Sequence, residues 1–168
     1  MSRPDDLESA DAAPEDHCGT CTACLDACPT EAFVAPYVLD ARKCLSYTTI
    51  ELRDAIPKEL RAGHGDWVFG CDVCQGVSPW NRNAPKTDDP TFAPRPTSQP
   101  LDLIELFDLD DAEFKRRFRD TPLWRSKRRG ILRNAAIVLG NQCAKAAIPA
   151  LTRGTHDPEP LIREACQW

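Results

Sequence analysis

Residues 18–29 read Cys-Gly-Thr-Cys-Thr-Ala-Cys-Leu-Asp-Ala-Cys-Pro, and this run decides the fold class of the segment around it. Its spacing, C-x2-C-x2-C-x3-C-P, is that of bacterial ferredoxins with two 4Fe-4S clusters. Three thiolates two residues apart wrap a tight loop around one cluster, and the fourth, followed by proline, ligates the other. A zinc site would separate its cysteine pairs by a dozen or more residues. The run therefore predicts two iron–sulfur sites that share this motif.

The second set of ligands is less regular. It consists of Cys44 and of residues 71–79, which read Cys-Asp-Val-Cys-Gln-Gly-Val-Ser-Pro and repeat the end of the first motif with serine in place of its last cysteine. The crosswise rule then predicts two ligand sets. The three-thiol site takes Cys18, Cys21, Cys24 and Ser78, and the four-thiol site takes Cys28, Cys44, Cys71 and Cys74.

Ser78 leaves several outcomes open at the three-thiol site. The serine can ligate iron as an alkoxide, although its high pKa makes it a poor ligand. The site can hold a 3Fe-4S cluster or a cubane whose fourth iron binds water, or it can stay empty. The serine can also reflect a change in a single codon. Among these, a labile or three-iron cluster is favoured.

The composition agrees with a soluble, metal-binding protein. The chain has 168 residues, nine cysteines, 15 prolines and a net charge of −5. No signal peptide precedes the cysteines, which disfavours a disulfide framework. No apolar run approaches the roughly 18 residues that a membrane span needs. We therefore expect a cytoplasmic protein that makes no membrane contact.

The expected fold class is α+β and mostly helical. Composition and apolar spacing divide the chain into four segments. A bacterial ferredoxin-like double 4Fe-4S unit precedes a short HEAT-like helical segment that ends as if truncated. The segments are an acidic disordered arm (1–16), the double-cluster unit (17–81), a proline-rich linker (82–100) and the helical part (101–168).

Apolar spacing in the last segment predicts helices over residues 101–107, 110–118, 131–141, 144–153 and from 161 onward, with Asp108 or Asp110 as an N-cap. Cys143 and Cys166 lie far from the other cysteines and are expected to be small buried apolar residues. His17, beside Cys18, is expected to be a loop residue, because cysteines already fill the sites.

The stretches CGTCTACLDACPTEAF, KCLSYTTIEL, IPKELR, WVFGCDVCQGVSPWN and TPLWRSKRRGILRNAAIVLGN resemble epoxyqueuosine reductase, which completes queuosine in the anticodon of certain tRNAs. The resemblance covers nearly everything from His17 to Trp168. The family has cysteine at the position of Ser78, and its members carry a catalytic, cobalamin-binding domain before the cysteines. The chain therefore looks like the C-terminal portion of such an enzyme, and no catalytic residue can be carried over.

The resemblance implies that the clusters relay electrons to cobalamin, which reduces epoxyqueuosine in tRNA. Ser46 lies in a stretch that is close to cobalamin in the family, so the resemblance makes it a candidate cobalamin contact. The expected partners are the tRNA anticodon region, a separate cobalamin-binding half and an electron donor. Whether this chain is an enzyme stays open, and alone it is expected to be inactive. The alternative is a stand-alone ferredoxin-type electron carrier that docks a partner through its helical tail.

A basic segment between Glu113 and Arg133 carries nine Lys or Arg and two acids on a chain of negative net charge. Either it contacts tRNA phosphates, or it is a solvated helix face that pairs with the acids of residues 102–111. The resemblance favours tRNA. The predicted tRNA contacts are Arg125, Lys127, Arg128 and Arg129.

Overall fold

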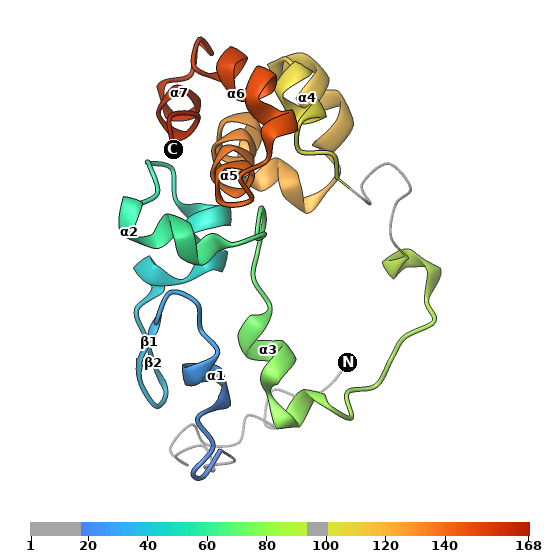
Figure 1. Cartoon of the computed structure of the whole chain (residues 1–168). Helices are drawn as coiled ribbons and strands as arrows, with labels where there is room; N and C mark the ends of the chain where they lie inside the picture. Colours follow the sequence, from blue (N-terminus) through green and yellow to red (C-terminus); the bar gives the residue numbers. More distant parts are fainter. Residues whose placement is uncertain (1–17, 94–100) are drawn as a thin grey trace, which may run out of the picture.

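The computed structural model describes residues 18–93 and 101–168. The predicted acidic arm, His17 and part of the predicted linker lie outside the described residues. The described chain is mostly helical with one small sheet (Figure 1), which confirms the α+β, mostly helical expectation. No helix in the described part is long and apolar enough to cross a membrane.

The cysteine-rich part is built from short elements. The two-stranded antiparallel sheet pairs β1 with β2, with Phe33 opposite Leu39, and the short helices α1 and α3 pack against each other. These elements form the lower part of Figure 1, below the helices α4 to α7. The bounds are α1 Ala23–Asp26, β1 Phe33–Ala35, β2 Val38–Leu39, a 3-10 turn Ala41–Lys43, a π-helical turn Tyr47–Glu51, α2 Lys58–Arg61, a 3-10 turn Ala62–His64, α3 Val73–Val77, and 3-10 turns Pro79–Asn81 and Pro90–Phe92.

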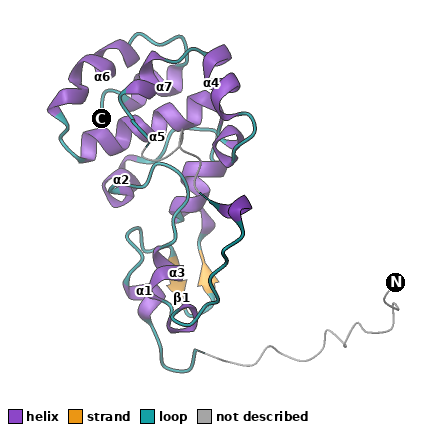
Figure 2. Cartoon of the chain, turned by 90° about the vertical axis from the view of Figure 1, so that its right-hand side faces the viewer, coloured by secondary structure: helices purple, strands orange, loops and turns teal. Residues whose placement is uncertain are grey.

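The C-terminal part surrounds one central helix, α5 (Figure 2), in which every residue from Gly130 to Leu139 is buried. A helix that is buried on all sides is expected at the centre of a core. The remaining elements are 3-10 turns Glu105–Asp108, Pro122–Arg125 and Lys145–Ala147, with α4 Asp111–Phe118, α5 Lys127–Asn141, α6 Ile148–Gly154 and α7 Pro160–Ala165.

Most of the predicted helices are present, with shifted ends. Asp110 is the N-cap of α4, because its carboxylate accepts the Glu113 backbone N–H at 2.7 Å. The segment 101–107 instead forms only the 3-10 turn Glu105–Asp108, and the last helix ends at Ala165. Helices α5 and α7 pack against each other, while a HEAT-like assignment of this part stays a prediction.

The hydrophobic core crosses the predicted segment limits. Ile56 belongs to the same buried cluster as the apolar side chains of α4, α5 and α7, and Leu60 and Phe69 pack against it. The stretch between Cys44 and Cys71 is therefore part of the helical body as well as of the cluster-bearing unit.

Of the two remaining cysteines, one behaves as predicted. Cys166 is half-buried, packs at the edge of the core beside Gly154, and burial raises the pKa of its thiol to about 12. The prediction that Cys143 is buried is wrong. Cys143 lies in the turn after α5 with a φ of 50°, and this left-handed backbone turns its side chain to solvent.

Candidate iron–sulfur sites and basic surface

The four cysteines of the four-thiol site line one hollow. The other walls are mostly apolar and come from the sheet and from the start of α3, with Phe33, Leu39 and Val73 among them. The thiols surround the hollow and do not converge on a point. Within residues 18–93 and 101–168, no three Cys, His, Asp or Glu side chains are close enough to hold a single metal ion.

Backbone groups favour the thiolate form of Cys28. The Ala32 N–H donates to Cys28 Sγ at 3.3 Å. Burial tends to raise the pKa of the Cys28 thiol, but the N–H of Ala32 and hydrogen bonds from Thr30 lower it overall. Burial raises the pKa of Cys71, and the nearby thiols of Cys44 and Cys74 raise it further by charge repulsion. Four thiols in one apolar hollow with an amide donor fit the ligand set of a 4Fe-4S cluster.

The three-thiol site lines a second hollow together with Ala23, Pro79 and Trp80. Cys18 and Cys21 are exposed and Cys24 is half-buried. Ser78 follows α3 directly, and its N–H donates to the Gln75 carbonyl at 3.3 Å. Its position repeats that of the fourth cysteine of the first motif, and the structure brings it to the three thiols. The donor set fits a three-iron cluster or a cubane with one weak ligand.

The structure therefore brings together the two sets of side chains that the crosswise spacing predicts. The geometric reason is the contact between α1 and α3, each of which leads from one hollow to the other. The last ligand of each motif lies at the far end of its helix, where it faces the three ligands of the other motif. Their role as ligands stays a proposal, developed below.

Ser46 also lines the four-thiol hollow. Its hydroxyl donates to the Cys71 carbonyl at 3.1 Å. This hydrogen bond gives Ser46 a place in the geometry of the four-thiol site, and its contact with cobalamin stays a prediction.

Sequence reasoning missed the polar contacts that fix the stretch between Cys44 and Cys71. Arg133 is only 1% exposed, and its guanidinium donates to the carbonyls of Thr48, Leu52 and Asp54. Burial, together with the positive charges of neighbouring arginines, lowers its pKa to about 10. The signal in the sequence was the polar pair Arg133 and Asn134 within an otherwise apolar stretch of α5.

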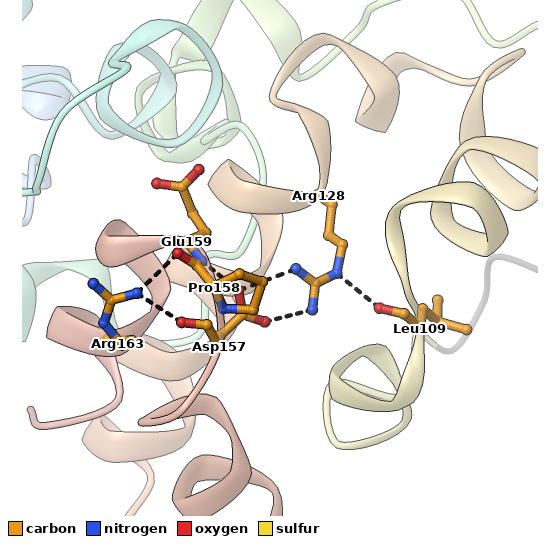
Figure 3. A network of polar contacts seen from close by, with 6 residues as sticks. All are labelled: Leu109, Arg128, Asp157, Pro158, Glu159 and Arg163. Carbon is orange, nitrogen blue, oxygen red and sulfur yellow. Dashed lines mark hydrogen bonds and ion pairs between the residues drawn. The ribbon is translucent and has the colours of Figure 1, made fainter.

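The predicted tRNA contacts divide into one largely enclosed residue and three exposed residues. The Arg128 side chain is 12% exposed and forms a two-pronged ion pair with Asp157, while its Nε donates to the Leu109 carbonyl (Figure 3). Burial tends to raise the pKa of Asp157, but Arg128 and Arg163 lower it overall. Arg128 therefore holds α5 to the turn before α7 and to the turn before α4, so we leave it out of the proposed tRNA surface.

The other three lie at the surface. Arg125 pairs with Glu51 at 2.6 Å, and Lys127 lies 3.7 Å from the centroid of the Trp124 ring. Arg129 is exposed and has no ion-pair partner among the described residues. Of the acids expected to neutralise the segment, Glu105 pairs with Arg117 at 2.9 Å. Arg125, Lys127 and Arg129 therefore form a basic surface at the start of α5.

Comparison with known proteins agrees with the geometry of the two hollows. Residues 17–81 match the family model described as a 4Fe-4S double cluster binding domain. The chain is thus an iron–sulfur protein, and its two cluster sites lie in a single domain.

The relatives are more specific. The chain is 49% identical to epoxyqueuosine reductase of Pseudomonas aeruginosa over 94% of this chain and 44% of the relative. It is 46% identical to the same enzyme of Xanthomonas campestris over 90% of this chain and 43% of the relative. The chain belongs to the epoxyqueuosine reductase family, and it spans less than half the length of these curated relatives.

Solved structures lead to the same family. A crystal structure of epoxyqueuosine reductase with an epoxyqueuosine-modified tRNA-Tyr stem loop superposes with a TM-score of 0.83 at 38% identity, covering 94% of this chain and 42% of that chain. The Bacillus subtilis enzyme superposes equally well, at 39% identity over the same shares.

Proposed function

We propose that this chain is the iron–sulfur electron-relay part of an epoxyqueuosine reductase, which reduces epoxyqueuosine to queuosine in tRNA with cobalamin. The observation that supports it most directly is the crosswise gathering of the eight motif positions around two hollows. Bound clusters would supply one-electron transfer at these sites. An electron donor would reach the three-thiol site, because two of its cysteines are exposed.

The chain's own residues hold and tune the clusters. The apolar walls of the four-thiol hollow exclude water, and the Ala32 N–H donates to Cys28 Sγ. Both effects act on the reduction potential of an iron–sulfur cluster. Cobalamin would be brought by a partner half, with Ser46 as the proposed contact from this chain. The hydroxyl hydrogen of Ser46 is already donated to Cys71, so such a contact would use the oxygen as an acceptor.

Anaerobic reconstitution tests the two cluster sites. We expect seven or eight irons per chain, with an isotropic EPR signal near g of about 2.01 after oxidation if the three-thiol site holds three irons. The test variant is Cys74→Ala, which removes a proposed ligand of the four-thiol site. Its matched control is Cys143→Ala, which removes an exposed cysteine outside both sites. Iron loss in Cys143→Ala equal to that in Cys74→Ala would contradict the assignment.

The proposed partner is tRNA, bound through the basic surface of Arg125, Lys127 and Arg129. The stem-loop complex of a related enzyme supports this proposal. Each phosphate contact releases counterions, so the logarithm of the association constant falls with the logarithm of salt concentration by about 0.7 to 0.9 per contact. Arg125 would exchange Glu51 for a phosphate, because the ion pair is exposed to solvent.

Filter binding of an anticodon stem loop over a range of salt concentrations tests this surface. Neutralising all three residues to Gln should reduce the slope by about 2 to 3. The control is the double variant Arg42→Gln and Lys43→Gln, which removes two charges from the turn before Cys44. A slope that the triple variant leaves unchanged, or that the control reduces equally, would remove the basic surface from the proposal.

A further inference from the structure

One buried hydroxyl joins the two strands of chain that carry Cys44 and Cys71. Thr49, in the π-helical turn Tyr47–Glu51, is completely buried. Its Oγ1 donates to the Leu45 carbonyl at 2.6 Å and accepts the Gly70 N–H at 3.0 Å. Leu45 directly follows one ligand of the four-thiol site, and Gly70 directly precedes another. The hydroxyl therefore fixes the distance between the peptides beside these two thiols.

A second hydroxyl from the same turn region acts on the other side of Cys71. Ser46 Oγ donates to the Cys71 carbonyl at 3.1 Å. The peptide before Cys71 and its own carbonyl are thus both held by one short segment. Gly70 has a φ of 73°, a conformation that glycine adopts without strain. The two hydrogen bonds and this turn together determine the direction in which Cys71 projects.

The helical body supports the clamp from outside. Asn134 Nδ2 donates to the carbonyls of Thr49 and Val68, both at 2.8 Å. Ser126 Oγ donates to the carbonyls of Thr49 and Ile50 at 3.0 and 3.1 Å. The π-helical turn is therefore anchored to α5, and the position of Thr49 is not free to relax.

We propose that Thr49 and Ser46 form a hydroxyl clamp that positions Cys44 and Cys71, and thereby sets the stability and spectroscopic character of the cluster at the four-thiol site. The proposal rests on the cluster site proposed above. Removing the Thr49 hydroxyl leaves the Gly70 N–H and the Leu45 carbonyl without that hydrogen-bond partner, which destabilises the peptides beside Cys44 and Cys71. The lost hydrogen bonds lie beside two proposed cluster ligands, so the protein should bind the cluster less tightly. Ligand geometry and hydrogen bonding also tune such clusters.

The chain offers a matched control in the preceding residue. Thr48 is equally buried, and its hydroxyl donates to the same Leu45 carbonyl at 3.2 Å, but its other contact is His64 and not the Cys71 strand. Thr49→Val and Thr48→Val remove the same atoms. Thr49→Ser keeps the hydroxyl and should restore the wild-type behaviour.

The experiment measures iron release to a chelator from the anaerobically reconstituted 168-residue chain, with EPR of the reduced protein. In Thr49→Val, the iron of the four-thiol site should leave about tenfold faster. The iron of the three-thiol site should leave at the wild-type rate, and the EPR line shape of the reduced four-thiol cluster should change. Thr48→Val and Thr49→Ser should stay within about twofold of wild type in the same assay. Circular dichroism of each variant checks that the helices are intact.

Three results would overturn the clamp. A Thr49→Val protein with wild-type iron release and EPR would remove it while leaving the cluster site in place. Equal effects of Thr48→Val and Thr49→Val would show a general loss of buried polar contacts. A wild-type chain that takes up no iron would overturn the proposed function and the clamp together.

Discussion

His64 is buried as a neutral side chain, which predicts a specific loss of stability in acid. Its ring is completely buried and lies near two buried arginines, Arg61 and Arg133. Thr48 Oγ1 donates to the Leu45 carbonyl, so it accepts from Nε2–H of His64 at 3.2 Å. Nδ1 has no hydrogen-bond partner in the described part of the chain. A second proton on this ring would therefore meet two positive charges and no acceptor.

The size of the effect follows from the pKa. Burial, followed by repulsion from Arg133 and Arg61, lowers the pKa of His64 from 6.5 to about 4. Between these two values the unfolded chain binds more protons than the folded chain, so the free energy of unfolding falls as the pH falls. The loss contributed by His64 is close to zero at pH 7.5 and about 2 kcal/mol at pH 5. For a chain of this size, that is about 4–8 °C in Tm.

The test compares wild type with His64→Leu, which fills the same space without titrating. Thermal unfolding is followed by circular dichroism under anaerobic conditions at pH 7.5 and pH 5. All other ionisable groups are the same in the two proteins, so their contributions cancel in the difference. We expect similar Tm values at pH 7.5 and a variant that is more stable than wild type at pH 5. Parallel losses of Tm in the two proteins would refute the reasoning.

Three further predictions concern single residues. Ser78→Cys should raise the iron content to about eight per chain and abolish any three-iron EPR signal, which iron analysis and EPR check. Arg128→Met should lower the free energy of unfolding by about 3 kcal/mol, because it leaves the Asp157 carboxylate without its ion-pair partner. The control Arg129→Met, at an exposed position, should change the free energy of unfolding by about 0.5 kcal/mol or less. Thermal unfolding measures both. Gly70→Ala should cost about 1–2 kcal/mol through backbone strain alone, since no atom lies within 4 Å of the added Cβ; an unchanged Tm would contradict this.

The spacing of the cysteines determined the cluster-site prediction without help from tertiary structure. Ligand order in a double-cluster motif follows from local loop geometry, because a tight loop can turn three thiolates inward and leaves the fourth for the other site. The N-cap at Asp110 is local in the same way, since its hydrogen bond spans three residues. These features depend on near neighbours in the chain.

The roles of the polar side chains were decided only by the tertiary structure. Arg128 and Arg129 are adjacent in a basic run, yet one is enclosed by Asp157 and Leu109 and the other faces solvent. Cys71, the partner of Ser46, and Gly70, one of the two partners of Thr49, lie more than twenty residues away, so no local pattern could reveal them. A hydroxyl or guanidinium satisfies its hydrogen bonds with whatever backbone the fold brings near it. For that reason, the residue types and their spacing predicted the ligands, and the packing of α5 against the stretch between Cys44 and Cys71 decided what holds them.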